Sequence, residues 1–221
     1  MVQGNNCIFN FKDTTNKYEL CPMKLVQNLI SENGKKVSKM DAIKMIEERR
    51  SVRKFKNEKV DRETMKEIIS ISRWAPSWKN LQIARYTLVD NEDIIKQLAT
   101  EGVNGFVYNI KTLKNAKGVA VLSFVKGKSG KMDEDNYATS KANAWEVFDA
   151  GIACQTFCLA AHAKGVGTCI MGVIDEESIA KIIGLPEEET VAALIVYGYE
   201  DEHPKATQRK DVDDIMRFIG E

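Results

Sequence analysis

The sequence predicts one α+β domain, and three observations support this fold class. Residues 143–164 form a helical pattern that is apolar on nearly every side, and strand-like segments lie near residues 86, 120 and 194. Helices and strands do not alternate in the regular β-α-β order that favours a parallel sheet. With 221 residues, 43% of them hydrophobic, the chain is long enough for one well-filled core.

The first residues differ in character from the rest of the chain. Residues 1–37 are polar and poorly periodic, so we expect an N-terminal extension before a domain that spans residues 38–221. The start has no charged region followed by an apolar run, and no segment approaches the ~18 apolar residues of a membrane span. We therefore expect a soluble, cytoplasmic protein.

Capping residues and breaks place the first helices. The pattern Ser38-x-x-Asp41 predicts a capped helix over "AIKMIEERR", with its apolar side chains on one face, namely Ala42, Ile43 and Ile46. A second helix begins at Asp61 and ends before Pro76, because proline disfavours helical geometry in the residue ahead of it. Shorter helices are expected over "NEDIIKQLATEG", closed by Gly102, and over "DEESIAKIIG".

Alternating or continuously apolar segments predict the strands, which are "ARYTLVD", "GVAVLSFV" and "TVAALIVYGYE". The charged residues 126–142 are longer than a simple turn, so they form a mobile lid, a short helix or a disordered surface loop. The helix over 143–164 has little polar surface, which indicates a large core or a subunit interface. We infer a homodimer.

The 32 basic and 32 acidic side chains give a formal net charge of zero. No long-range field therefore draws the protein to nucleic acid or to a membrane, and we expect neither as a partner. An anion site must come from a local cluster, and "RRSVRKF" brings Arg49, Arg50, Ser51 and Arg53 together at a predicted helix end. This cluster is either an anion site or a solvated helix end whose cations complement the helix dipole.

Five cysteines, an odd number, argue against a disulfide framework in a chain of this size. Cys154 and Cys158 could share a helix face, but a metal site needs three or four ligands and only His162 is a further candidate nearby. We expect reduced, buried thiols and no metal.

The glycines of "GVGTCIMG" do not make a dinucleotide fingerprint. Position 170 is isoleucine where G-x-G-x-x-G requires glycine, and the segment follows a helix, whereas the fingerprint follows a strand. Gly165, Gly167 and Gly172 either let the backbone approach something flat or turn the chain from helix to strand, and the turn is favoured.

Taken in order, "RRSVRKF", "APSWKNLQ", "DAGIACQTFCLAAHAKGVGTCIMG" and the tail "HPKATQRKDVDDI" resemble the FMN-dependent nitroreductase family over about residues 40–212. The resemblance implies a three-layer α+β fold, with a central, largely antiparallel sheet flanked by helices. It also implies a homodimer with two FMN molecules at the subunit interface and NAD(P)H as co-substrate.

The resemblance implies three groups of FMN-binding residues. The residues expected to bind the phosphate and the ribityl chain are Arg49, Arg50, Ser51, Arg53 and Arg209. Lys205 is a further candidate that matches the family less closely. A loop that approaches the flavin of the other subunit contains Pro76, Ser77, Trp78, Asn80 and Gln82. The main-chain N–H groups expected to face the flavin ring belong to Cys169, Ile170, Met171 and Gly172.

The implied chemistry is carried by FMN, with no catalytic side chain, in a ping-pong transfer from NAD(P)H to a nitroaromatic, a quinone or a related conjugated acceptor. Ile83 and Ala84 stand where relatives often have proline and an aromatic residue, so the substrate pocket departs from the family pattern. The alternatives are a flavin-binding or regulatory module without turnover, and a specialised dehydrogenase or dehalogenase of the same fold.

Overall fold

The computed structural model describes residues 42–220. The predicted extension, residues 1–37, and the capping pattern at 38–41 lie outside the described residues. In chain order the elements are α1 (Ala42–Glu48), α2 (Arg62–Ser72), the 3₁₀ turn η2 (Trp78–Asn80), β1 (Ala84–Val89), α3 (Glu92–Glu101), α4 (Val107–Asn115), β2 (Gly118–Val125), α5 (Ala144–Ala163), β3 (Val166–Met171), α6 (Glu176–Ile183), β4 (Glu189–Tyr199) and α7 (Val212–Ile215).

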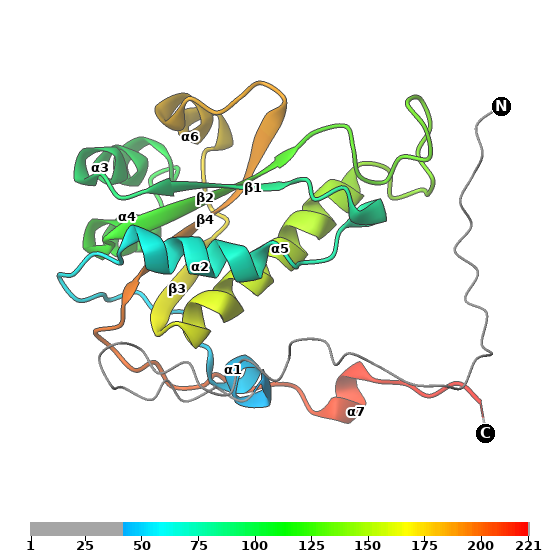
Figure 1. The fold of residues 1–221 in the computed structure, drawn as a ribbon. Helices are drawn as coiled ribbons and strands as arrows, with labels where there is room; N and C mark the ends of the chain where they lie inside the picture. Colours follow the sequence, from blue (N-terminus) through cyan, green and yellow to red (C-terminus); the bar gives the residue numbers. More distant parts are fainter. Residues whose placement is uncertain (1–41, 221) are drawn as a thin grey trace, which may run out of the picture. The chain divides into compact units, whose positions relative to one another are not determined.

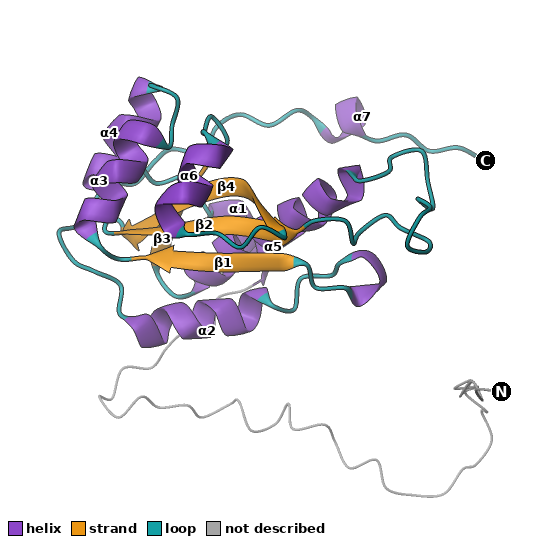
Figure 2. Cartoon of the chain, turned by 90° about the horizontal axis from the view of Figure 1, so that it is seen from above, coloured by secondary structure: helices purple, strands orange, loops and turns teal. Residues whose placement is uncertain are grey.

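The four strands form one sheet in the order β1-β2-β4-β3, and every neighbouring pair is antiparallel (Figure 2). This confirms the α+β class and the antiparallel sheet. In the centre of the sheet Val121 pairs with Leu194, and both side chains are fully buried. Ala120 and Ile195, which pair on the other face, are fully buried as well, so the two central strands are covered on both faces, as their continuous apolar sequences predict.

Helices cover both faces of the sheet and make three layers. In Figure 1, α3 and α6 lie on one side of the sheet, and α2 and α5 lie on the other. Alternate residues of β2 separate the two cores: Val119 and Val121 pack with α3, α4 and α6, whereas Ala120 and Leu122 pack with α2 and α5. This alternation follows from the two-residue period of a strand.

The central helix α5 matches the predicted apolar helix closely in its bounds. Its buried face is rich in small residues around Phe157, which lets the helix pack closely on the sheet. The opposite face leaves Val147 and Phe148 exposed by 63% and 58%. A helix that is apolar on both faces is thus buried on only one of them within a single chain.

The helices differ from the predictions in three ways. Helix α2 begins after its cap Asp61 but ends at Ser72, because the chain turns through hydrogen bonds from Trp74 N to Ile71 O and from Ala75 N to Ser72 O. The expected apolar face of α1 does not join the core, since Ile43 and Ile46 are 65% and 60% exposed. Helix α4 was not predicted at all.

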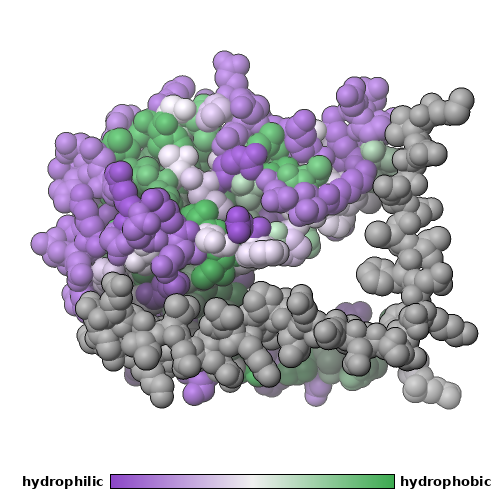
Figure 3. All heavy atoms as spheres, viewed as in Figure 1, coloured by the Kyte–Doolittle hydropathy of each residue, from purple (hydrophilic) through white to green (hydrophobic). Residues whose placement is uncertain are grey.

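Residues 126–142 contain turns and one isolated bridge, from Lys131 to Tyr137, and no helix. The prediction of a short helix there is therefore wrong. On the face seen in Figure 3, hydrophilic residues cover most of the surface and apolar residues form small groups between them. Among residues 42–220 there is no helix long and apolar enough to cross a membrane.

Candidate functional site

The segment after α1 is fixed against one end of the sheet. Val52 N donates to Thr168 O of β3 at 2.9 Å, and Lys56 N donates to Tyr199 O of β4 at 2.8 Å. Val52 and Phe55 are buried and anchor the segment in the core. The polar residues between these anchors are thereby held at the surface in a defined order.

Two glycines allow this close approach. A Cβ on Gly167 would lie 3.0 Å from Val52 Cβ, and one on Gly198 would lie 2.9 Å from Phe55 Cδ1. The turn predicted between helix and strand occurs at Gly165, whose φ is +73°. In this chain Gly167 therefore meets a neighbouring segment of the protein, and the helix-to-strand turn is confirmed at Gly165.

The basic residues predicted for the phosphate lie around one cavity of about 150 Å³, which we call the arginine cavity. Two distant segments form it, one after α1 and one after β4. Its lining residues are Arg49, Arg50, Ser51, Arg53, Pro204, Lys205, Thr207 and Arg209. All six residues of the predicted phosphate group are therefore brought together, and Thr207 is an addition that sequence reasoning missed.

The cations of the arginine cavity have no anionic partner within the described part of the chain. Arg53 Nη1 donates to Ser51 O at 3.3 Å, and Arg209 Nη1 donates to Thr207 O at 3.0 Å. Arg49 Nε is buried and has no hydrogen-bond partner among residues 42–220. A buried donor without a partner is rare in native proteins, so this geometry favours an oxyanion.

The second predicted group, the loop 76–82, has a strained backbone. Lys79, Asn80 and Gln82 have φ values of 48°, 55° and 51°, which lie in the left-handed region. Left-handed backbone costs most L-residues, such as Lys79 and Gln82, about 1–2 kcal/mol, while asparagine adopts it more readily. Strain of this kind persists only where surrounding contacts hold it, and it clusters at functional sites.

Those surrounding contacts are hydrogen bonds at both ends of the loop. Ser77 Oγ accepts from Gln82 N at 2.8 Å. The carboxylate of Asp149 on α5 accepts from Trp78 N at 3.1 and 3.0 Å and from Ser129 Oγ at 2.6 Å. Asp149 is only 4% exposed. Sequence reasoning missed it, although an acidic residue in an otherwise apolar helix is a signal that it needs buried partners.

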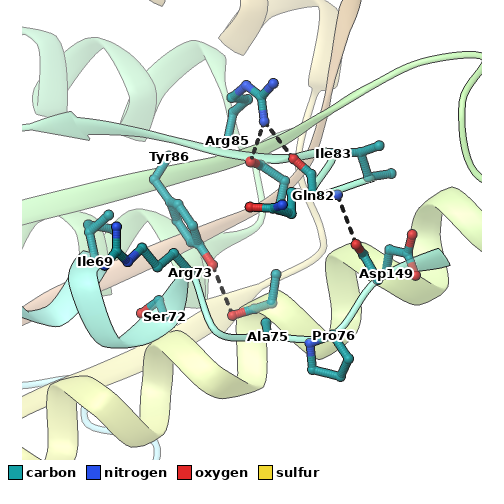
Figure 4. Close-up of a pocket in the computed structure, with 13 residues that line it drawn as sticks. Ile69, Ser72, Arg73, Ala75, Pro76, Gln82, Ile83, Arg85, Tyr86 and Asp149 are labelled. Atoms are coloured by element: carbon teal, nitrogen blue, oxygen red, sulfur yellow. Dashed lines mark hydrogen bonds between the residues drawn. The ribbon is translucent and has the colours of Figure 1, made fainter. Parts of the chain in front are cut away.

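The loop borders a second cavity of about 330 Å³ (Figure 4). Pro76, Ser77 and Gln82 line it, while Trp78 and Asn80 do not. Its other lining residues are Ile69, Ser72, Arg73, Ala75, Ile83, Ala84, Arg85, Tyr86, Asp149 and Ala153. No residue lines both this cavity and the arginine cavity, so within one chain the first two predicted groups border separate cavities.

Tyr86 is the only phenol that lines this second cavity, and its hydroxyl donates to Ala153 O at 3.0 Å. Burial raises the pKa of Tyr86 well above its usual range. The phenol therefore remains protonated at neutral pH and serves as a hydrogen-bond donor.

The third predicted group lies at the end of β3. Cys169 and Met171 are buried, while Ile170 between them is 46% exposed. Burial raises the pKa of Cys169, so this thiol is held in its neutral, unreactive form. Nothing within 4 Å would meet a Cβ on Gly172, which leaves the main chain open at this position.

The cysteines that the structure describes are free and buried, as predicted for Cys154 and Cys158. Cys7 and Cys21 lie outside the described residues. Residues 42–220 contain no group of three or more His, Cys, Asp or Glu side chains arranged to hold a metal ion.

Comparison with known proteins gives a consistent picture. The sequence model of the Nitroreductase family matches residues 46–199, which excludes the tail that carries Lys205 and Arg209. A protein of Methanothermobacter thermautotrophicus with the provisional name NADH dehydrogenase/NAD(P)H nitroreductase is 27% identical over 184 residues, covering 81% of this chain and 88% of that protein.

Two solved structures have the same fold. An FMN-dependent nitroreductase from Clostridium difficile R20291 has a TM-score of 0.64 and 28% identity, covering 80% of this chain and 98% of that chain. A nitroreductase-like protein from Exiguobacterium sibiricum, solved in complex with FMN, has a TM-score of 0.71 and 21% identity, covering 81% and 98%.

Proposed function

The chain belongs to the Nitroreductase family, and we propose that it is an FMN-dependent enzyme that passes electrons from NADH or NADPH to a nitroaromatic, a quinone or a related conjugated acceptor. Membership of the family supports an oxidoreductase function. FMN is supported by the FMN-dependent relative from Clostridium difficile. The nicotinamide co-substrate is consistent with the name of the archaeal relative.

The arginine cavity is the observation that carries this proposal. Five cationic side chains from two segments surround it, and they have no carboxylate partner in residues 42–220. A phosphate monoester matches them, since it carries about −1.5 to −2 charges at neutral pH and accepts several hydrogen bonds. The Nε of Arg49 has no acceptor within residues 42–220, and a phosphate oxygen would supply one. The residues therefore fit the phosphate end of FMN.

The other two groups suit the flavin ring. The exposed side-chain amide of Asn80 can both donate and accept at a polar ring edge. The open main chain at Gly172 suits N–H groups that face a flat ligand. FMN held there would supply the hydride and electron transfer between NAD(P)H and the acceptor. The chain's own residues bind and orient the cofactor, and we assign no side chain to proton transfer.

We infer that the complete site needs two chains. In one chain the loop 76–82 and the arginine cavity share no lining residue, and α5 leaves Val147 and Phe148 exposed. A second copy that packs on this face could bring its loop to the flavin of the first. Dilution should then release flavin as the dimer dissociates. A monomer in sedimentation that still holds stoichiometric FMN would exclude the shared site.

The function is tested on the purified full-length protein. We expect a yellow flavin spectrum, with FMN, and not FAD, released on denaturation. Steady-state oxidation of NADH and of NADPH should depend on an added nitroaromatic or quinone, and double-reciprocal plots should be parallel if donor and acceptor occupy one space in turn. A protein that binds FMN but does not oxidise either nucleotide would be a flavin-binding module, and a protein that binds no flavin would refute the proposal.

A further inference from the structure

Asp149 connects three parts of the molecule that are far apart in the sequence. It belongs to α5, and its carboxylate accepts hydrogen bonds from the loop 76–82 and from the segment 126–132. We propose that Asp149 is a positioning residue that fixes the loop 76–82 and joins it to the segment 126–132, so that loss of its carboxylate releases both. The consequence for flavin rests on the proposed function, whereas the joining of the two loops does not.

The carboxylate of Asp149 is buried, and both of its oxygens accept hydrogen bonds. The residue is 4% exposed and Ser129 is fully buried. Both carboxylate oxygens are used: Trp78 N lies 3.1 and 3.0 Å from them, and Ser129 Oγ lies 2.6 Å from one. A buried carboxylate is costly unless it is hydrogen-bonded, and bonds to a charged acceptor are roughly twice as strong as neutral ones. These bonds therefore hold both donors in place.

The side chains of the loop reinforce the same connection. Trp78 Nε1 donates to Lys131 O at 3.2 Å, and Lys79 Nζ donates to the carbonyls of Lys131 and Met132 at 3.1 and 3.2 Å. The Trp78 ring also packs on Trp145 of α5, with ring centroids 4.9 Å apart. The segment 126–132 is thus attached to the loop and does not form an independent lid.

The position of Trp78 explains why this contact matters for the site. The left-handed residues Lys79 and Asn80 follow it directly, so its main chain is the fixed point from which the strained turn starts. Loss of this fixed point would let the turn relax and would redirect the Asn80 amide. Because Asn80 belongs to the group proposed for the flavin ring, the effect should not depend on the phosphate.

Glu146 provides a matched control on the same helix. It is 5% exposed and accepts from Lys128 N at 2.9 Å, and within residues 42–220 it makes no hydrogen bond to the loop 76–82. Asp149→Leu and Glu146→Met each replace a buried carboxylate by an apolar side chain of similar size. Asp149→Asn keeps one acceptor oxygen and should restore part of what Asp149→Leu loses.

Hydrogen exchange on the flavin-free protein tests the joining of the loops directly. Asp149→Leu should speed exchange tenfold or more in both 77–82 and 128–132, the size expected when hydrogen bonds to a charged group are lost. Asp149→Asn should fall between this variant and the parent, and Glu146→Met should affect only the residues around Lys128. If Asp149→Leu does not fold, the parent and Asp149→Asn still test the proposal. Fast exchange of the Trp78 amide in the parent would overturn it. Unchanged exchange at 77–82 in Asp149→Asn would also overturn it.

Flavin binding tests the consequence at the site. Asp149→Leu should weaken the binding of FMN and of riboflavin by the same factor, and Glu146→Met should change neither affinity by more than twofold. Loss of FMN affinity with unchanged riboflavin affinity in Asp149→Leu would overturn the assignment to the ring. If the parent binds no flavin, the proposed function fails, while the exchange experiment still decides whether Asp149 joins the two loops.

Discussion

The guanidinium groups of the arginine cavity contact mainly carbonyls of their own segments, whereas the loop 76–82 is fixed from outside by a buried carboxylate on α5. The first region can bind through charge, which tolerates small changes in side-chain geometry. The second depends on a strained backbone that distant residues must hold. Substitutions should therefore separate affinity for the phosphate from placement of the ring.

The largest effect is expected in the arginine cavity. Charge-assisted hydrogen bonds contribute about 1.5–3 kcal/mol each, and ~1.4 kcal/mol is a factor of ten. Arg49→Ala and Arg53→Ala should each weaken FMN binding about tenfold or more, as measured by flavin fluorescence titration. Riboflavin lacks the phosphate, so its weaker binding should change little, and the difference gives the coupling between arginine and phosphate.

Arg62 is the control for this experiment. Its side chain is 82% exposed and pairs with Asp90 at 2.9 Å on the surface. An exposed pair contributes about 0–1 kcal/mol, so Arg62→Ala should leave both flavin affinities unchanged. Equal losses for FMN and riboflavin in the Arg49 and Arg53 variants would show that the arginines do not contact a phosphate.

A smaller effect is expected where the arginine segment meets the sheet. A Cβ on Gly198 would lie 2.9 Å from Phe55 Cδ1 and 3.1 Å from Phe55 Cβ, so Phe55 and its segment must shift. Gly198→Ala should lower the free energy of unfolding by about 1–3 kcal/mol in urea, the usual cost of overpacking. The substitution should also weaken the binding of FMN more than that of riboflavin, because the shift moves Arg53. Unchanged stability would mean that the segment is not held as tightly as these distances indicate.

The sequence predicted the arginine cavity far better than the contacts of the loop. Arg49, Arg50, Ser51 and Arg53 are consecutive enough to be noticed as a cluster, and the family resemblance added the tail residues. The long apolar helix and the central strands were also predicted, since their periodicity extends over many residues. Local patterns therefore sufficed for residues that are neighbours in the chain, whereas the tail residues of the cavity came from the resemblance.

Tertiary contacts decided the rest. Asp149 meets Trp78 and Ser129 only after α5 has packed on the sheet, and nothing local indicates these partners. Helix α4 escaped prediction because Phe106 at its N-cap makes no side-chain capping bond, while its Leu113 is fully buried by packing. Burial of this kind can override weak local signals.

The smallest effect is expected from the backbone of Lys79, whose φ is 48°. Alanine and glycine at this position both lose the amine's bonds to the carbonyls of Lys131 and Met132, so the two variants differ mainly in backbone preference. Left-handed backbone costs an L-residue about 1–2 kcal/mol, and the greater freedom of glycine in the unfolded chain offsets about 0.4–1 kcal/mol of that difference. Lys79→Gly should therefore be more stable than Lys79→Ala by about 0.5–1 kcal/mol in denaturant unfolding.

Lys66 on α2 gives the opposite order and serves as the control. It is exposed, and its amine bonds to Glu63, so alanine and glycine again lose the same contact. In a helix interior glycine is less favourable than alanine by about 0.8–1 kcal/mol, and Lys66→Gly should be the less stable variant there. If glycine is the more stable variant at Lys79 and alanine the more stable variant at Lys66, the loop is strained before any ligand binds. The same order at both positions would mean that the loop has ordinary backbone, and the contrast with the arginine cavity would then lie in side chains alone.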